Sequence, residues 1–528
     1  MTTKAAKAAK YQRLVFAASN GNARLAANKT KGRHVKATTN LTKGTTVFVE
    51  TAAAFALLKH AIDERCLYCC SELESDSVNG KINLLGGTSS NSSTKIKCPN
   101  CIKQTFYCSQ ECLNLDAPRH LLECKIVRDL PGITAAAKVD YTLMRLVLAV
   151  LVQRHLENIG ENHGENTHTD LVFDLLSHRK TCDPKWLACV EACAEDFASH
   201  LPTELAIPVS DIVSLACRIN SNSHGIIDPT GNTNGEVGVG MFPLVAMLNH
   251  SCAPNCSFVS STHGIMIVRT LCPVQEGQEL CVSYVDLCTP RDERRDTANL
   301  DTNDSHLDAI LCTSCSSCNA FHDSLQEFQC TLCSNKISKD QHTSITHAAE
   351  SSHNNAHDLF RARHNDSAIT AFQQFLSDYK SMLHPGHSLF LNAYATMTSA
   401  YMRVRDFPGV VKYGRLSIKT MSQYVPQNWP ELADFRFRQA EMMEILGRVV
   451  GEGVISVEEA RCAFDDGVED VPTSEKDELS RFILGEALIA FETCLEMRRV
   501  AYGDGHVRTQ EVASQVDRLR RDVSTKEE

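Results

Sequence analysis

Residues 249–256 of the chain read NHSCAPNC, directly after the apolar, glycine-containing stretch EVGVGMFP at 236–243. Residues 277–284 read GQELCVSY, and near the N-terminus residues 31–37 read KGRHVKA. Taken alone, NHSCAPNC could also be an ordinary loop, because a polar turn with cysteines after an apolar stretch is common. The order of these strings along the chain is more informative than any one of them, and the rest of the sequence is interpreted around it.

The bulk composition indicates a globular chain with an acidic balance. The 528 residues can form roughly two to four domains, each with its own core. Hydrophobic residues make up 43% and charged residues 22%, which are ordinary values. The net charge of -11 argues against a surface that coats nucleic acid, but it is compatible with basic peptide substrates. No apolar run reaches the roughly 18 residues of a membrane span, so no membrane association is expected.

Cysteine is the residue type that points to chemistry. The chain contains 24 Cys, and no apolar signal-peptide core precedes them. In a reducing compartment, clustered Cys are first interpreted as metal ligands. Residues 66–124 contain four spaced ligand pairs, enough for two tetrahedral zinc sites, although Cys70 is an alternative to Cys69. The pairs are Cys66 and Cys69, Cys98 and Cys101, Cys108 and Cys112, and His120 and Cys124.

Hydrophobic patterning divides the chain into strand-rich and helix-rich regions. Residues 11–58 alternate as β-strands do, and short strands with Gly and Pro turns return at 225–290. Residues 140–220 show helical spacing. From residue 366 onward the chain is Ala-rich and helical, as in a solenoid of paired helices.

Two polar stretches are predicted to lack a packed structure. Residues 75–93, rich in Ser, Asn and Gly, predict a disordered loop. Residues 339–365 contain five His among Ser, Asn and Asp, and we interpret this stretch as a solvated linker rather than a metal site.

Together these strings resemble the signatures of SET domains. NHSCAPNC resembles the NHSCxPN signature, GQELCVSY the GEELxxxY strand, and KGRHVKA the GxG cofactor loop. Tyr107 just before Cys108, with seven residues between Cys112 and His120, resembles a MYND finger. In this order, with the helical tail, the chain is similar to the SET-and-MYND family of protein-lysine methyltransferases over residues 11–515.

The resemblance implies an α+β fold. A β-rich SET domain would carry an inserted MYND zinc finger and a helical insert, followed by a zinc-binding post-SET segment and a C-terminal all-α, TPR-like helical domain. The expected parts are 11–65 (N-terminal part of the SET domain), 66–124 (MYND finger), 125–240 (helical insert), 241–290 (C-terminal part of the SET domain), 305–335 (post-SET segment), 336–365 (linker) and 366–528 (helical domain).

The resemblance also implies a cofactor and a catalytic residue. S-adenosylmethionine would donate the methyl group, and transfer from its sulfonium to a neutral lysine amine requires in-line alignment. The hydroxyl of Tyr284 would align the methyl group and the amine. A half-buried strand tyrosine and a structural histidine are the alternatives for Tyr284 and His178. The residues expected to contact the cofactor are Lys31, Gly32, Arg33, His178, Asn222, Asn249 and His250.

About three zinc ions per chain are expected. MYND fingers are cross-braced, which implies one ion on Cys66, Cys69, Cys108 and Cys112, and another on Cys98, Cys101, His120 and Cys124. In the post-SET site, Cys252 of the signature would join three cysteines that follow it, and the pair Cys330 and Cys333 offers alternatives. The expected ligands of this third ion are Cys252, Cys312, Cys315 and Cys318.

Two positions depart from the family pattern. His34 stands where the second glycine of the cofactor loop is usual, so it would crowd the cofactor or change the backbone conformation. The aromatic residue that stacks on adenine just before the post-SET cysteines is absent, and Leu311, Thr313 and Ser314 occupy that neighbourhood. Either another aromatic residue, such as Phe321, holds the adenine, or the cofactor is held weakly.

Three function classes compete. An enzyme that methylates lysine in histone or non-histone proteins is the first, and a catalytically weak scaffold built on the finger and the helical tail is the second. A sequence-specific DNA-binding zinc protein is disfavoured by the acidic balance and the ligand spacing. The expected partners are a lysine-bearing protein or peptide and a proline-containing peptide at the finger. The expected compartment is the cytoplasm, the nucleus or both.

Overall fold

A computed structural model provides the structure of this protein. The structure describes residues 3–73, 95–101, 105–160, 168–228, 235–289, 309–316, 319–322, 327–330, 332–465, 468 and 470–524. The loop expected at 75–93 lies outside the described residues.

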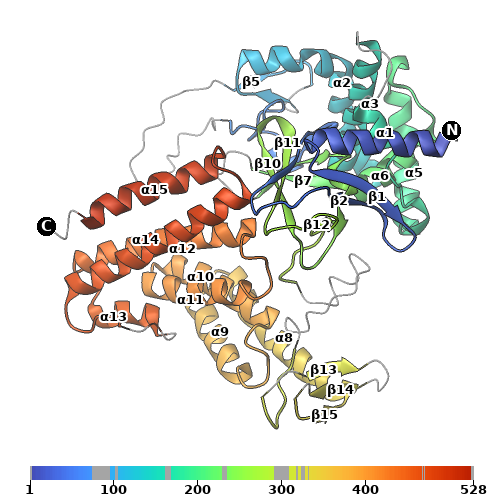
Figure 1. The fold of residues 1–528 in the computed structure, drawn as a ribbon. Helices are drawn as coiled ribbons and strands as arrows, with labels where there is room; N and C mark the ends of the chain where they lie inside the picture. Colours follow the sequence, from blue (N-terminus) through green and yellow to red (C-terminus); the bar gives the residue numbers. More distant parts are fainter. Residues whose placement is uncertain are drawn as a thin grey trace. The chain divides into compact units, whose positions relative to one another are not determined.

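The chain forms two compact units. The first contains Met1–Asn249, Phe258–Leu280 and His506–Arg508, and the second contains His250–Ser257, Cys281–Gly505 and Thr509–Glu528 (Figure 1). The signature string therefore begins in the first unit with Asn249 and continues in the second.

Small antiparallel sheets form the β part of the protein. The largest has the strand order β1-β2-β12-β9, and Val35 of β2 lies opposite Leu25 of β1 and Leu280 of β12. The other sheets with three or more strands have the orders β10-β11-β3, β4-β8-β7 and β13-β14-β15. The strands are β1 (Ala23–Asn28), β2 (Gly32–Ala37), β3 (Thr46–Thr51), β4 (Ala54–Leu57), β5 (Ile96–Lys97), β6 (Phe106–Tyr107), β7 (Ser223–Ile227), β8 (Glu236–Met241), β9 (Asn249–His250), β10 (Cys256–Ser261), β11 (Ile265–Thr270), β12 (Glu279–Val282), β13 (Asn319–His322), β14 (Glu327–Cys330) and β15 (Lys336–Ile337).

Helices inserted between the strands provide the main core of the first unit. Helix α3 is buried from Met144 to Val152, so it has no solvated face along this stretch. The side chains of Ser109 and Asp140 cap α2 and α3 by accepting hydrogen bonds from backbone N–H groups of the first turn. The helices of this unit are α1 (Thr3–Ala18), α2 (Gln110–Ala137), α3 (Tyr141–Ile159), α4 (His168–Phe173), α5 (Pro184–His200) and α6 (Val209–Asn222).

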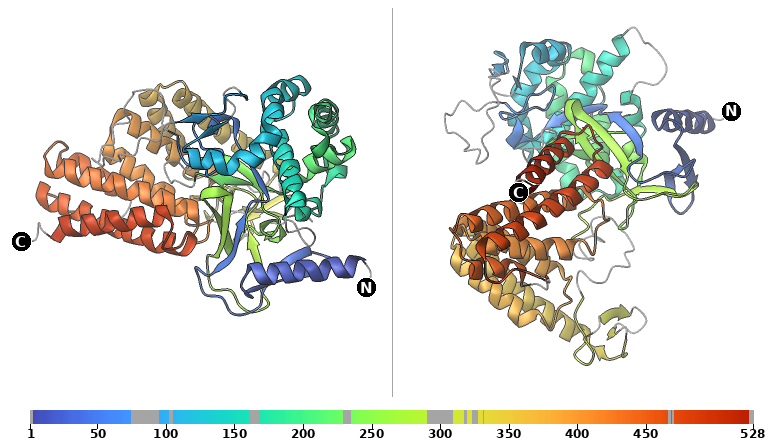
Figure 2. Two further views of the ribbon diagram at one scale, coloured as in Figure 1. Left: turned by 90° about the horizontal axis from the view of Figure 1, so that it is seen from above. Right: turned by 60° about the vertical axis from the view of Figure 1, so that its left-hand side comes forward.

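Helices also dominate the second unit, as the TPR-like prediction requires. Consecutive helices from α8 to α12 pack on one another, and α12 packs along α14; they are the yellow to red helices in Figure 2. None of the described helices is long and apolar enough to cross a membrane. The helices are α8 (Lys339–Arg361), α9 (Asn365–Tyr379), α10 (Ser388–Val404), α11 (Phe407–Met421), α12 (Pro430–Gly451), α13 (Val457–Arg461), α14 (Lys476–Ala501) and α15 (Val507–Ser524), whose first two residues belong to the first unit.

The predicted linker at 336–365 is wrong, because most of it is helix α8. Ser338 and Gln341 form a capping box at its start, and Ala349, His353 and Ala356 are buried along one face. The buried face consists of two alanines and a histidine, so the polar composition concealed an amphipathic helix. The imidazole of His353 packs edge-on against phenyl rings of α9.

Two further boundaries differ from the prediction. Residues 11–18 belong to helix α1, although the alternating pattern predicted strands from residue 11 onward. The boundary between finger and insert at residue 124 falls inside α2, which runs from the finger into the insert without a break. The α+β fold class with a C-terminal helical domain is confirmed.

A buried ion pair joins the finger to the insert. Arg145 of α3 donates hydrogen bonds of 2.9 and 2.6 Å to the two carboxylate oxygens of Glu123 on α2. Their side chains are 4% and 0% exposed. Burial opposes ionisation of Glu123, but the charges of Arg119 and Arg145 outweigh it and hold the pKa of this carboxyl far below its ordinary range.

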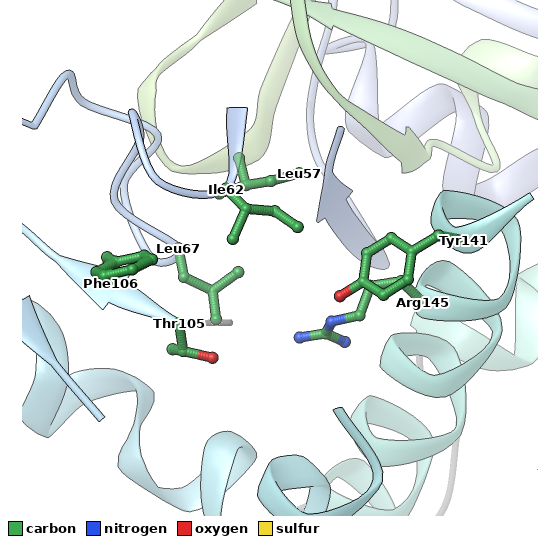
Figure 3. A pocket seen from close by; sticks show the side chains of 7 residues that line it. All are labelled: Leu57, Ile62, Leu67, Thr105, Phe106, Tyr141 and Arg145. Carbon is green, nitrogen blue, oxygen red and sulfur yellow. The ribbon is translucent and has the colours of Figure 1, made fainter. Parts of the chain in front are cut away.

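A cavity of about 10 Å³ lies beside this pair. The hydroxyl of Thr105, which has no hydrogen-bond partner among the described residues, and the guanidinium of Arg145 point toward it from opposite sides (Figure 3). Tyr141 also lines it. The volume and the polar lining suit one water molecule and are far too small for a cofactor.

Breaking the buried pair should destabilise the first unit strongly. We expect Arg145→Met to lower the free energy of unfolding by about 3 kcal/mol or more, because it removes one of two cations and both guanidinium hydrogen bonds of Arg145 from the buried Glu123 carboxylate. Arg179→Met is the matched control: Arg179 pairs with Glu191 on the surface, and the transition should scarcely move. Chemical denaturation followed by circular dichroism provides the measurement. Equal effects of the two variants would contradict this account.

Candidate functional site

The finger contains two tetrads of ligand atoms. Cys66, Cys69, Cys108 and Cys112 form one, and Cys98, Cys101, His120 and Cys124 form the other, with all ligand atoms in each within 4.8 Å of one another. These are the two sets that the cross-braced resemblance implies. Cys69 rather than Cys70 belongs to the first set.

The spacing within the tetrads fits zinc. Ligand sulfurs on a tetrahedral zinc with bonds of about 2.3 Å lie about 3.8 Å apart. The Sγ atoms of Cys69 and Cys108, and those of Cys108 and Cys112, are 3.6 Å apart. In the second tetrad the Sγ atoms of Cys98 and Cys124 are 3.7 Å apart. These separations are too long for disulfides and match four ligands around one ion.

The third tetrad differs from the predicted post-SET ligands. It consists of Cys312, Cys315, Cys330 and Cys333, with Sγ–Sγ distances of 3.4 to 3.6 Å for the hydrogen-bonded pairs. Cys252 does not belong to any tetrad among the described residues, and its role as a zinc ligand stays a prediction. Cys318 lies outside the described residues.

The hairpin fold explains this ligand set. The antiparallel pairing of β13 with β14 and of β14 with β15 makes one small sheet, and Cys330 ends β14. Cys330-x2-Cys333 thus supplies a second complete knuckle, and no ligand from the signature string is needed. With the two finger sites, three tetrads fit about three zinc ions per chain.

The cofactor loop between β1 and β2 is held by local hydrogen bonds. The side-chain oxygen of Asn28 accepts from the N–H groups of Thr30 and Lys31 at 3.0 and 2.6 Å. Gly32 follows with φ of +64°, a conformation that disfavours a side chain. The glycine of the KGR string is therefore explained by backbone geometry. Arg33 extends over the ring of Tyr11 at 5.8 Å.

Glu279 connects this loop to the signature residue Asn249. The carboxylate lies 2.5 Å from Lys31 Nζ and accepts from Asn249 Nδ2 at 3.0 Å. Asn249 Nδ2 also donates to the carbonyl of Lys31 at 3.2 Å. Partial burial opposes ionisation, but the hydrogen bonds from Lys31 and Asn249 lower the pKa of Glu279. The single acidic residue of the GQEL string thus connects two segments that are predicted to contact the cofactor.

His34 occupies the position where the family pattern has its second glycine. Its side chain is buried and does not project into the loop. It is 2% exposed, and its Nδ1 lies 3.2 Å from the carbonyl oxygen of Gly32, so this nitrogen donates. The ring is folded back on its own strand. The side chain of Phe321, the suggested alternative for holding adenine, lies outside what the structure describes.

Asn222 and His178 lie on two connected segments. Asn222 Nδ2 donates to the carbonyls of Leu176 and Arg218 at 2.9 and 2.8 Å, so its Oδ1 is the atom left to accept. Arg218 Nε donates to the Leu175 carbonyl at 3.0 Å. His178 follows with φ of +47° and starts a 3-10 turn. The last turn of α6 therefore holds the segment on which His178 lies.

In the second unit, His250 is hydrogen-bonded to Tyr284, the predicted catalytic residue. Its Nδ1 accepts from the backbone N–H of Tyr284 at 2.8 Å, and the two rings are 5.4 Å apart. Because Nδ1 accepts, Nε2 carries the proton of the neutral ring, and it lies 3.2 Å from Cys252 Sγ. Tyr284 is 56% exposed. The imidazole thus fixes the backbone at Tyr284, a residue that is more than half exposed.

Comparisons with known proteins agree with these motifs. A family model described as SET domain matches residues 32–285. Human N-lysine methyltransferase SMYD2 is 24% identical over 405 residues, covering 75% of this chain and 83% of that protein. N-lysine methyltransferase SMYD2-A of Xenopus laevis is 24% identical over 403 residues, covering 75% and 84%. The chain thus contains a region that matches the SET domain model and is similar along three quarters of its length to protein-lysine methyltransferases.

Sequence reasoning missed the acidic residues that hold segments of this protein together. Glu279 was visible as part of GQELCVSY, but the motif points to Tyr284 and gave no role to the carboxylate. Glu50 and Glu123 belong to no motif, and their burial is a property of the fold alone. Cys330 and Cys333 were recognisable as an alternative, because their spacing equals that of the finger knuckles.

Metal analysis tests this ligand set. We expect three zinc ions per purified chain, from the three tetrads. Cys330→Ser should lower the count to two, whereas Cys252→Ser should leave it at three, since only Cys330 belongs to a tetrad. Inductively coupled plasma mass spectrometry on full-length protein provides the count. Loss of zinc on replacing Cys252, with none on replacing Cys330, would restore the family-type site.

Proposed function

We propose that this protein transfers a methyl group from S-adenosylmethionine to a lysine side chain of a protein substrate. The observation that carries the proposal is the hydrogen bond from the Tyr284 N–H to His250, which holds an exposed tyrosine at the end of the SET motif. The protein substrate is a histone or a non-histone protein. The reduced cytoplasm or nucleus, where thiolate ligands persist, is the proposed compartment.

The chain offers groups that fit the amino-acid end of the cofactor. That end carries a carboxylate and an ammonium group; Lys31 and Arg33 provide cations for the former, and Asn222 Oδ1 provides an acceptor for the latter. When bound, S-adenosylmethionine supplies an electrophilic methyl group on a sulfonium. Gly32 allows close approach of the loop, because it has no side chain. Asn249, His250 and His178 complete the proposed set of cofactor contacts.

Tyr284 is the proposed catalytic residue. Its hydroxyl would hold the lysine nitrogen and the methyl group in line, which lowers the entropic part of the barrier. His250 would keep the tyrosine backbone at a fixed position through Nδ1. Asn249 and Lys31, bound to each other and to Glu279, would keep the cofactor loop in place before the cofactor binds.

A scaffold without strong catalysis is the second candidate for the whole chain. The absence of an aromatic residue at Leu311, Thr313 and Ser314 favours it. The burial of His34 removes one argument for it, because a ring folded onto its own strand does not crowd the loop. Cofactor affinity, measured by calorimetry, separates the two functions.

We also propose that the finger binds a proline-containing peptide. Leu115 and Leu121 of α2 are 55% and 80% exposed, which provides apolar surface on the finger helix. Leu121→Asp should weaken binding of a labelled proline-rich peptide about tenfold, as expected from the loss of one buried leucine contact. Ile489→Asp, at a 57% exposed position of α14, is the control and should bind as the parent does. Fluorescence polarisation is the measurement, and an unchanged affinity for Leu121→Asp contradicts the assignment.

Tyr284→Phe separates chemistry from binding. We expect turnover to fall by about two orders of magnitude or more, because the variant lacks the aligning hydroxyl, while cofactor affinity changes little. Asn249→Ala should instead weaken cofactor binding itself. Turnover is measured by transfer of a radiolabelled methyl group, and affinity by calorimetry. A Tyr284→Phe protein that methylates as fast as the parent would exclude this catalytic role.

A further inference from the structure

Strand β3 buries a carboxylate at a position where strands usually bury an apolar residue. Glu50 is 3% exposed, whereas its neighbour Val49 is 57% exposed. Side chains alternate between the two faces of a strand, so this strand turns its charged residue inward and its apolar residue outward. A buried carboxylate persists only where donors surround it, and such local exceptions concentrate at functional sites.

Two of the donors belong to the chain that enters the signature string. The N–H of Leu244 lies 2.9 and 3.1 Å from the two carboxylate oxygens of Glu50, and the N–H of Val245 lies 2.9 Å from one of them. These residues begin the 3-10 turn η4 (Val245–Met247), whose first N–H groups have no acceptor within the turn. Asn249 follows shortly after η4. Glu50 therefore fixes the path by which the chain reaches Asn249.

The third donor comes from α4. His168, the first residue of this helix, has its Nε2 3.0 Å from Glu50 Oε1. A carboxylate oxygen only accepts, so Nε2 carries the proton. Helix α4 leads to Leu176, whose carbonyl accepts from Asn222, and then to His178. Glu50 thus joins the turn before Asn249 to the helix before His178.

Two carboxylates act on the imidazole of His168. Burial opposes its charge, but the hydrogen bond and charge of Glu50, with a contribution from Glu157 of α3, raise the pKa of His168 above its ordinary value. Glu157 itself accepts from the N–H of Thr169 at 3.2 Å. Arg154 and Asp170, 3.7 Å apart, are the other charged pair at the start of α4.

We propose that Glu50 is a positioning residue for methyl transfer. Its carboxylate holds η4 and α4 in one fixed arrangement, so that Asn249 and the His178 segment present their groups to the same cofactor molecule. The inference rests on the proposed function, because its effect is read at the cofactor site. Misplacement of a binding group by about 1 Å is enough to cost roughly a hundredfold in rate.

The first test is Glu50→Gln in the full-length protein. We expect S-adenosylmethionine to bind at least about tenfold more weakly by calorimetry, at a temperature well below the thermal transition. Glu204→Gln is the matched control, since it removes the same charge at an exposed position of the first unit. A variant with a lowered melting temperature but parental affinity would assign Glu50 a structural role only and overturn the inference.

A second variant keeps the test decisive if Glu50→Gln does not fold. His168→Phe retains a ring at a side chain that is 34% exposed and removes the donor. The charged hydrogen bond is present below the raised pKa of His168 and lost as pH rises through it, so cofactor affinity of the parent should fall over that interval. His168→Phe should bind more weakly and lack this decline. Parental affinity with the same pH profile would overturn the inference, whereas a parent that binds no cofactor would overturn the proposed function itself.

Discussion

A buried carboxylate must be surrounded by donors, and in this protein the donors come from segments far apart in the sequence. Glu50 accepts hydrogen bonds from backbone N–H groups of the turn before the signature string and from the imidazole of His168 on α4. Glu123 accepts two hydrogen bonds from the guanidinium of Arg145 on α3. Asp228 receives two hydrogen bonds from Arg65, the residue directly before the finger. Because leaving any of these groups unpaired is costly, each fixes the position of one element on another more narrowly than apolar packing does.

Three CxxC turns among the described residues share one backbone conformation. In the three CxxC turns at Cys66, Cys312 and Cys330, the residue after the second cysteine has φ near +60° and donates its N–H to the carbonyl of the first cysteine. That residue is Cys70 in the finger turn, which explains why Cys70 is buried beside the tetrad without belonging to it. The same local geometry in the post-SET segment makes its tetrad independent of the signature string.

The residues that we propose to contact the cofactor are held in place by hydrogen bonds to one another and to neighbouring residues. Asn249, Lys31 and Glu279 satisfy one another by hydrogen bonds, and His250 uses one ring nitrogen to hold the backbone of Tyr284. Binding groups held in this way lose less entropy when the ligand arrives. Catalysis by alignment depends on such preorganisation, because an in-line displacement needs its groups in place rather than a strong acid or base.

The order of NHSCAPNC, GQELCVSY and the paired cysteines predicted the SET domain, the α+β class and the two tetrads of the finger, since each depends on residue types at fixed local spacing. The grouping of Cys330 and Cys333 with Cys312 and Cys315 became visible only in the tertiary structure, because local spacing does not record which cysteine pairs lie together. Helix α8 was missed because alanines and His353 form its buried face. The role of Glu50 became visible only in the tertiary structure. A carboxylate in a strand is normally predicted to lie on the surface, and only the fold shows that Glu50 is buried among hydrogen-bond donors.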